Sequence, residues 1–273
     1  MNNHEYHSRP EIGSSMLKDF RKSPALYYAK HVAKSIKQKS TPALKFGTLL
    51  HCLVLEPEEL ENRYIISSQG ARRGKKWDAD VIDAFKSDRE CILESELAKA
   101  QAMLESVMEH AQARSLFEAG GIAEAPVFWD RDVDGTTLSL KAKPDLMIPT
   151  GFSIPFCLDV KSTKEITPRG FAKQSMDLEY DAQAAHYTEG TRHHLGLEPE
   201  EPCGFAFVAI CNEPPYPVWI RVCTDKFMDG GAKLNDEALA GIALRTSGTL
   251  AWCETGQQDM NSIQSSLDPL WDR

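Results

Sequence analysis

Charged residues in the middle of the chain have the spacing of a site for a divalent cation and a phosphate. Asp145 stands at the end of one apolar run, the next run carries Asp159 and Lys161, and a turn at residues 149–151 joins the two. Residues two apart on a strand point to the same face, so Asp159 and Lys161 share a face while Val160 points into the core. If the strands pair, Asp145 reaches the same spot. Two carboxylates and one ammonium there suit a metal and a phosphate.

The order Pro144-Asp145, then Asp159-Val160-Lys161, resembles the signature of the PD-(D/E)xK nucleases, with Asp in the (D/E) place. The pattern is short, and a solvated strand edge that carries Asp and Lys is the alternative interpretation. The resemblance implies an α/β fold with a restriction-endonuclease-like core, in which a mixed central sheet is flanked by helices.

Composition narrows the class of protein. The chain has 273 residues, of which 42% are hydrophobic, so it can build a core of one large domain or two small ones. It has no apolar run that approaches the roughly 20 residues of a membrane span, and its N-terminus has no apolar signal-peptide core. Seven scattered cysteines without a CxxC pair favour reduced thiols in a cytoplasmic protein of a bacterial or phage-infected cell, without an iron–sulfur or zinc site.

The net charge of -9 is unusual for a protein that binds DNA, but the charge is unevenly distributed. Residues 1–45 hold nine Lys or Arg and three Asp or Glu, a local charge of +6, and the remaining residues sum to -15. A second basic cluster consists of Arg72, Arg73, Lys75 and Lys76. We expect these four side chains to contact the DNA backbone; the alternative is an ordinary solvated loop.

The elements that must position these residues follow from local signals. Ser23-Pro24 and Thr41-Pro42 predict helix starts, and the second helix runs through Leu55 with an apolar stripe. We expect further helices over 16–21, 77–85, 95–110, 168–196 and 225–253, and strands over 63–67, 124–129, 137–140, 205–211 and 218–223. Residues 68–76 are expected to form a mobile loop, and the polar last twenty residues are typical of a disordered tail.

The helix that begins after Thr41 carries a second motif. Its sequence from Gly47 to Pro57 closely resembles the start of the catalytic domain of exodeoxyribonuclease VIII, the RecE type of this superfamily. In such enzymes a helix histidine is a metal ligand, and His51 occupies that place. A single helix histidine is more often an ordinary residue, but its context beside Asp-x-Lys favours the ligand.

The third motif is Tyr180-Asp-Ala-Gln183-Ala-Ala-His-Tyr187, which resembles the Gln-xxx-Tyr motif that follows Asp-x-Lys in the RecB and RecE branch. Gln183 and Tyr187 are four residues apart and therefore share one helical face. The resemblance implies that these residues and Tyr180 position the DNA strand; the alternative is a helix packed through its tyrosines. Glu124 matches, by order, an acidic residue that relatives place before the first Asp, and a surface glutamate is as good an interpretation.

The resemblance covers residues 14–225 and implies a single nuclease domain over 1–273: a helical part at 1–60 with the motif histidine, a catalytic core at 120–225, and a C-terminal helical segment and tail at 226–273. It implies that Asp145, Asp159, His51 and the Val160 carbonyl hold Mg²⁺, for which Mn²⁺ can substitute, and that Lys161 orients water or neutralises phosphate. Glu124 is a further catalytic candidate.

RecE-type enzymes degrade linear duplex DNA from 5' ends and leave 3' strands for an annealing protein, and some relatives form rings. We therefore expect a homo-oligomer, a tetramer, that binds duplex ends and has no membrane partner. Two other functions stay open: an endonuclease of the same fold, and a non-catalytic module for DNA ends or proteins.

Overall fold

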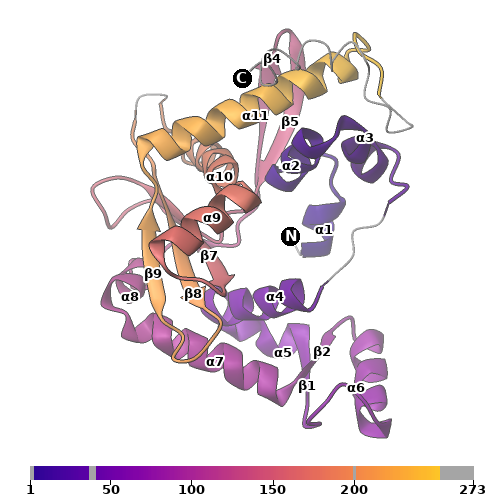
Figure 1. Ribbon diagram of the computed structural model, residues 1–273, viewed down its shortest axis with the longest axis vertical. Coiled ribbons are helices and arrows are strands. Elements are labelled where there is room, and N and C mark those ends of the chain that lie inside the picture. The colour runs from indigo at the N-terminus through magenta and orange to yellow at the C-terminus, as the bar shows by residue number, and fades with distance from the viewer. Residues whose placement is uncertain (1–2, 37–40, 199–200, 253–273) are drawn as a thin grey trace, which may run out of the picture.

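The computed structural model describes residues 3–36, 41–198 and 201–252, and a five-stranded sheet lies at its centre (Figure 1). The strand order is β3–β6–β7–β8–β9, and only the β7–β8 pair is parallel. The expected mixed sheet is therefore confirmed. The strands are β3 (Ile122–Ala123), β6 (Leu146–Ile148), β7 (Phe156–Thr163), β8 (Gly204–Cys211) and β9 (Val218–Val222).

Helices cover both faces of the sheet (Figure 1). The side chains of β7 alternate between these two layers. Leu158 and Val160 are fully buried against one layer, which consists of α4 (Pro42–Leu55), α7 (Glu94–Glu109) and α8 (Ala111–Glu118). Cys157 packs into the other layer, and so do the β8 side chains Phe205 and Phe207. That layer contains α2 (Ser14–Lys22), α9 (Pro168–Leu178), α10 (Tyr180–Leu195) and α11 (Asp225–Thr246).

The serine- and threonine-proline signals mark true helix starts. The Ser23 hydroxyl accepts the N–H of Leu26 at the start of α3 (Pro24–Tyr27), and the Thr41 hydroxyl accepts the N–H of Leu44 at the start of α4. The helix expected from residue 95 begins one residue earlier. Helix α7 starts at Glu94 because the Glu96 carboxylate accepts the N–H of Leu93 at 2.9 Å.

The glycines of α11 allow two helices to approach closely. A Cβ atom on Gly231 would lie 2.0 Å from the carbonyl oxygen of Asp181 on α10, so only glycine fits. The helix ends at Thr246, short of the expected residue 253. Residue 253 and the tail expected to be disordered lie outside the described residues.

A hairpin of β4 (Val127–Val133) and β5 (Thr136–Ala142) packs beside α10 and α11 (Figure 1). The prediction that Glu124 opens the first of these strands is wrong. Glu124 lies in a left-handed turn, with φ 49°, between β3 and β4. Its N–H donates to the Asp145 carbonyl at 3.0 Å, so the turn is fixed beside the catalytic candidates.

A small lobe, here called the basic lobe, lies beyond α4 from the sheet (Figure 1). It consists of β1 (Tyr64–Ser67), α6 (Lys75–Lys86) and β2 (Glu90–Leu93), and β1 pairs with β2 in parallel. Helix α6 begins at Lys75, two residues before the expected start, so two of the four basic residues belong to a helix. The remaining short elements are α1 (Asn3–Ser8), the π-helix η1 (Tyr28–Val32), the 3-10 helix η2 (Pro57–Glu59) and α5 (Leu60–Arg63).

Among the helices that the structure describes, none has both the length and the apolar character needed to span a membrane. The six cysteines that the structure describes are free, and four of them are buried.

Candidate active site

The pairing of β6 with β7 brings the two aspartates together. Leu146 pairs with Leu158, so Asp145 enters the sheet opposite Asp159, and both are on the face opposite to Leu158 and Val160. Asp145 Oδ2 accepts the N–H of Val160 at 2.6 Å. Asp145 and Asp159 are buried, with 6% and 2% of their surfaces exposed. The sequence predicted that strand pairing would bring these two carboxylates together, and this prediction is confirmed.

Asp159 has a separate partner on each carboxylate oxygen. Lys161 Nζ lies 2.6 Å from Oδ2, which confirms that the two side chains share a face. Gln183 Nε2, from the first half of α10, donates to Oδ1 at 3.0 Å. Gln183 therefore contacts the Asp159 carboxylate directly, a contact that the sequence did not predict.

His51 reaches the same place from α4 on the other side of the sheet. Its Nε2 lies 2.9 Å from the carbonyl oxygen of Val160, and its Nδ1 lies 3.4 Å from Asp145 Oδ1. The adjacent Leu50 and Leu53 are buried, which anchors this turn of the helix. His51, expected from the helix motif, thus lies beside the Val160 carbonyl and the Asp145 carboxylate, which are two of the other predicted metal ligands.

Glu124 joins this cluster from its left-handed turn. Its Oε1 lies 3.9 Å from His51 Nδ1, and its other oxygen forms an ion pair with Lys143. One ligand atom from each of His51, Glu124 and Asp145 falls within 4.8 Å of the other two. Asp159 is not in this group because its carboxylate faces Lys161 and Gln183.

Burial and close charges set the protonation of these groups. Burial raises the pKa of Asp159 to about 6 and Asp145 adds to the rise, while Lys161 opposes it. Burial disfavours a charged His51 ring, but Asp145 and Glu124 outweigh it and raise the pKa of His51 well above its usual value. Burial also opposes the Lys161 charge, but Asp159 outweighs it and raises the pKa of Lys161, so the ammonium persists.

The donor set fits a hard divalent cation. It offers carboxylate oxygens, a backbone carbonyl and one imidazole, the ligands that Mg²⁺ and Mn²⁺ accept. Asp159 Oδ2 is buried, and the Lys161 ammonium lies 2.6 Å from it.

A cleft of about 660 Å³ leads to Lys161. The α10 residues Tyr180, Gln183 and Tyr187 line it, and so do residues of α2 and η1 from the basic N-terminal segment. Five of its lining residues are Lys or Arg and one, Glu179, is acidic. The lining cations are Lys18, Arg21, Lys30, Lys141 and Lys161.

The matching family model covers residues 13–249, which include every element from α2 to α11, and it describes a PDDEXK-like domain of unknown function (DUF3799). The chain belongs to this PDDEXK-like family. The superfamily expected from the Asp-x-Lys strand is therefore confirmed, and the RecE type stays a prediction.

A solved structure is similar to this PDDEXK-like fold. A crystal structure of a "Putative exonuclease" from Eubacterium rectale is similar with a TM-score of 0.63 and 16% identity, over 96% of this chain and 92% of that one. The structure of SSO0001 has a TM-score of 0.31 and 13% identity over 82% of this chain and 96% of that one, which is too low to bear on the fold. Among curated proteins, the sequence search found no match.

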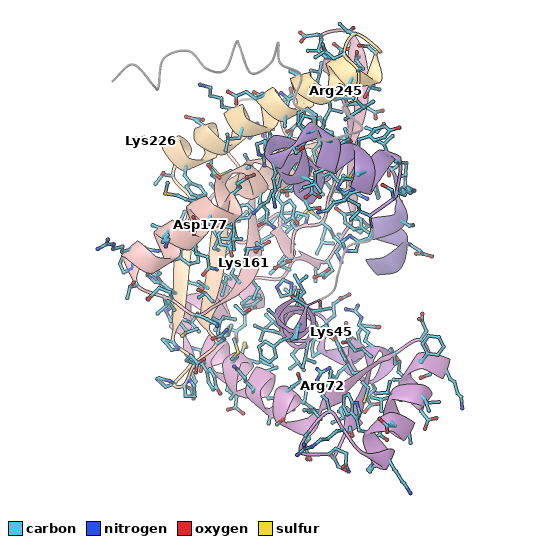
Figure 2. The ribbon with its side chains drawn as sticks, turned by 45° about the vertical axis from the view of Figure 1, so that its right-hand side comes forward. Lys45, Arg72, Lys161, Asp177, Lys226 and Arg245 are labelled. Carbon is cyan, nitrogen blue, oxygen red and sulfur yellow. The ribbon has the colours of Figure 1, made fainter. Side chains whose placement is uncertain are left out.

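The four basic residues at 72–76 lie on the basic lobe rather than at the PDDEXK-like cleft. Figure 2 shows Arg72 and Lys161 on opposite sides of α4. Arg72 forms an ion pair with Glu96 at 2.8 Å and lies over the Trp77 ring, and Lys76 pairs with Asp80 at 3.4 Å. Arg73 and Lys75 are exposed.

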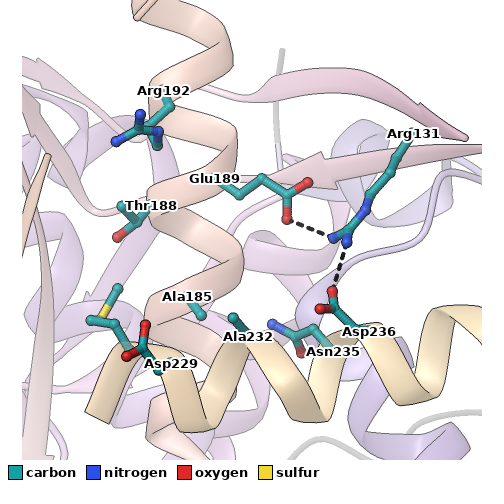
Figure 3. Close-up of a pocket in the computed structure, with 10 residues that line it drawn as sticks. Arg131, Ala185, Thr188, Glu189, Arg192, Asp229, Ala232, Asn235 and Asp236 are labelled. Atoms are coloured by element: carbon teal, nitrogen blue, oxygen red, sulfur yellow. Dashed lines mark hydrogen bonds and ion pairs between the residues drawn. The ribbon is translucent and has the colours of Figure 1, made fainter. Parts of the chain in front are cut away.

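A second pocket, of about 210 Å³, lies between α10 and α11 (Figure 3). Arg131 projects into it and pairs with Glu189 at 3.4 Å and Asp236 at 2.6 Å. Because Arg131 ties the hairpin to one acidic residue on each of the two helices, we assign these charges to packing.

Sequence reasoning missed two further residues around the PDDEXK-like site. Lys143, which pairs with Glu124, stands two positions before Asp145, and that period-two spacing was a usable signal. Gln174, on α9, donates to the Tyr180 hydroxyl at 2.9 Å, and its sequence context offered no signal.

Proposed function

We propose that this chain is a metal-dependent exodeoxyribonuclease of the RecE type, which hydrolyses linear duplex DNA from its 5' ends and leaves 3' single strands for an annealing protein. The observation that carries the proposal is the convergence of Asp145, Asp159 and Lys161 where β6 meets the central strand β7, with His51 beside them, at the end of a basic cleft. The Eubacterium rectale protein with the same fold bears the name "Putative exonuclease", which supports the same class of activity.

In this proposal Asp145, Asp159, His51 and the Val160 carbonyl hold Mg²⁺, or Mn²⁺ in its place, and Glu124 is close enough to contribute an oxygen. Such a cation supplies Lewis-acid charge to a phosphate oxygen and makes water more acidic. Lys161 keeps its charge and lies beside Asp159, where it stabilises negative charge that develops on the phosphate. Gln183 fixes the Asp159 carboxylate, and Tyr187 lines the path of the DNA strand.

The proposed partner is the end of a DNA duplex, and the proposed assembly is a homotetramer, a ring that surrounds the DNA. The distribution of charge supports this, because cations of residues 1–45 line the cleft in a chain with net charge -9. One sign of charge focused in a cleft outweighs the net charge at short range. Light scattering measures the assembly, and a monomer would contradict the ring.

Digestion of end-labelled DNA tests the activity. With Mg²⁺, linear duplex should lose its 5' label first as short products, while the 3'-labelled strand persists and covalently closed circles survive. EDTA should abolish the reaction. Nicking of closed circles would assign an endonuclease, and binding of ends without hydrolysis under any divalent cation would assign a non-catalytic module.

A further inference from the structure

Lys161 has a second neighbour besides Asp159. Its Nζ lies 5.0 Å from the centroid of the Tyr180 ring, within the range of a cation–π contact. A lysine ammonium ends a flexible four-carbon chain, so a single ion pair leaves its position loosely defined. The ring and the carboxylate together define one position for the Lys161 ammonium.

The ring itself is fixed on both sides. Tyr180 is 6% exposed and stacks on Phe207 of β8, with centroids 5.1 Å apart and planes at 29°. Phe171 of α9 lies against it at 6.0 Å. This packing leaves the ring little freedom to move toward a ligand in the cleft.

Hydrogen bonds connect Tyr180 back to the strand that carries Lys161. Gln174 Nε2 donates to the Tyr180 hydroxyl at 2.9 Å, and Thr163 Oγ1 donates to Gln174 Oε1 at 2.7 Å. Thr163 ends β7, two residues after Lys161, and its side chain is buried. These contacts form a loop that begins at Thr163 of β7, passes through Gln174 and the Tyr180 ring, and ends at Lys161 of the same strand.

The backbone before Tyr180 is fixed as well. Glu179 joins α9 to α10 in the left-handed conformation, with φ 55° and ψ 49°. Arg21 of α2 binds its carboxylate at 2.5 Å and 2.8 Å. This link determines the direction in which α10 starts, and hence where its first residue, Tyr180, places its ring.

We propose that Tyr180, held by Gln174, is a positioning residue for Lys161 rather than a platform for a DNA base. The proposal rests on the proposed nuclease function for its kinetic consequence only. A buried ring that is stacked on Phe207 and bonded to Gln174 acts on DNA through Lys161, so its loss should lower turnover and not substrate affinity.

Steady-state kinetics on linear duplex tests this with a matched control. Tyr180→Leu should lower kcat about tenfold and change KM by less than about twofold, because a partly desolvated cation–π contact has that scale. Tyr180→Phe keeps the ring and should stay within about threefold of wild type. Tyr64→Leu makes the same change at a tyrosine of similar burial on β1, in a different core cluster from Tyr180, and it should change kcat little.

A double-mutant cycle shows whether Tyr180 acts through Lys161. In a Lys161→Ala background, Tyr180→Leu should cost less than about twofold, since the contact is already gone. An equal tenfold loss in both backgrounds, an equal loss in Tyr64→Leu, or a rise in KM at constant kcat would each overturn the proposal.

An NMR measurement separates this inference from the nuclease function. The order parameter of the Lys161 Cε group should be high in wild type and in Tyr180→Phe, and it should fall in Tyr180→Leu. If it does not fall, the positioning role is wrong. If it falls while the wild-type protein hydrolyses no DNA, the positioning role stands and the proposed function is wrong.

Discussion

The candidate active site and the basic lobe both contain lysine or arginine beside acidic residues, but their surroundings differ. In the candidate site, the Lys161–Asp159 pair measures 2.6 Å, and the two side chains are 18% and 3% exposed. On the lobe, the Lys76–Asp80 pair measures 3.4 Å, and the Lys76 side chain is 54% exposed. Exposed ion pairs contribute about 0–1 kcal/mol to the free energy of unfolding, whereas a buried charge strongly shifts the pKa values of its neighbours.

The comparison teaches that burial, and not the number of charges, distinguishes a site for chemistry from a surface for binding. Burial raises the pKa of Asp159. On the lobe, Arg72 and Lys76 have acidic partners close by in open solvent. We therefore expect substitutions in the candidate active site to change turnover, and substitutions on the basic lobe to change the affinity for DNA alone.

The largest effect should follow Asp159→Ala. Loss of this carboxylate removes a cation ligand and the partner of Lys161, so hydrolysis should fall at least about a thousandfold. End-labelled digestion measures the loss, and circular dichroism verifies the fold. Asp177→Ala, at an exposed position on α9, is the control and should keep full activity. A folded Asp159→Ala protein with near-normal hydrolysis would falsify the assigned site.

An intermediate effect should appear in the pH dependence of Mn²⁺ affinity. The pKa of Asp159 is raised to about 6 and that of His51 lies well above its usual value, so both groups hold protons more tightly than usual. A cation requires both groups deprotonated, so its affinity should rise with pH through about 6, where Asp159 loses its proton, and rise further above the usual pKa of histidine as His51 does, with release of protons.

Calorimetry in two buffers of different ionisation enthalpy counts those protons. His51→Ala removes the group with the higher pKa, so the rise should then end near the pKa of Asp159. An affinity that stays constant over this pH range would contradict the assigned ligands.

The smallest effect should come from charge reversal of Arg72, Arg73, Lys75 and Lys76. If the lobe contacts the DNA backbone, affinity should weaken on the order of tenfold at low salt, equally for every sequence, and the salt dependence should become shallower. Turnover at saturating DNA should not change. Lys226→Glu with Lys233→Glu, on the exposed side of α11, is the matched control. An unchanged salt slope would assign the lobe cations to solvent.

Much of the secondary structure could be predicted from local signals. Proline and hydroxyl residues gave the starts of α3 and α4, and apolar runs gave β7, β8 and β9. The misplaced boundaries have local causes that propensity alone does not resolve. A glutamate three residues into α7 capped its N-terminus, and Glu124 adopted a left-handed turn that few non-glycine residues take.

The sequence by itself determined that Asp159 and Lys161 share a face, because the period of a strand is two, and that Asp145 could join them. It could not determine which outer groups reach them. Helix α10 brings Gln183 to Asp159 across 24 residues of the chain, α9 brings Gln174 to Thr163 across 11, and a turn brings Glu124 to Asp145 across 21. Such contacts depend on how helices pack on the sheet, which local pattern does not encode.

For the basic residues as well, the sequence determined the clustering and the tertiary structure decided the position. Their clustering is visible in the chain, but the tertiary structure placed residues of 1–45 along the cleft and put Arg72 across α4 from Lys161 (Figure 2). It also buried Tyr180 beneath Lys161, where the motif alone suggested a DNA contact. Charge and residue type are properties of the sequence, whereas burial, which decides what those charges can do, arises only when distant elements pack together.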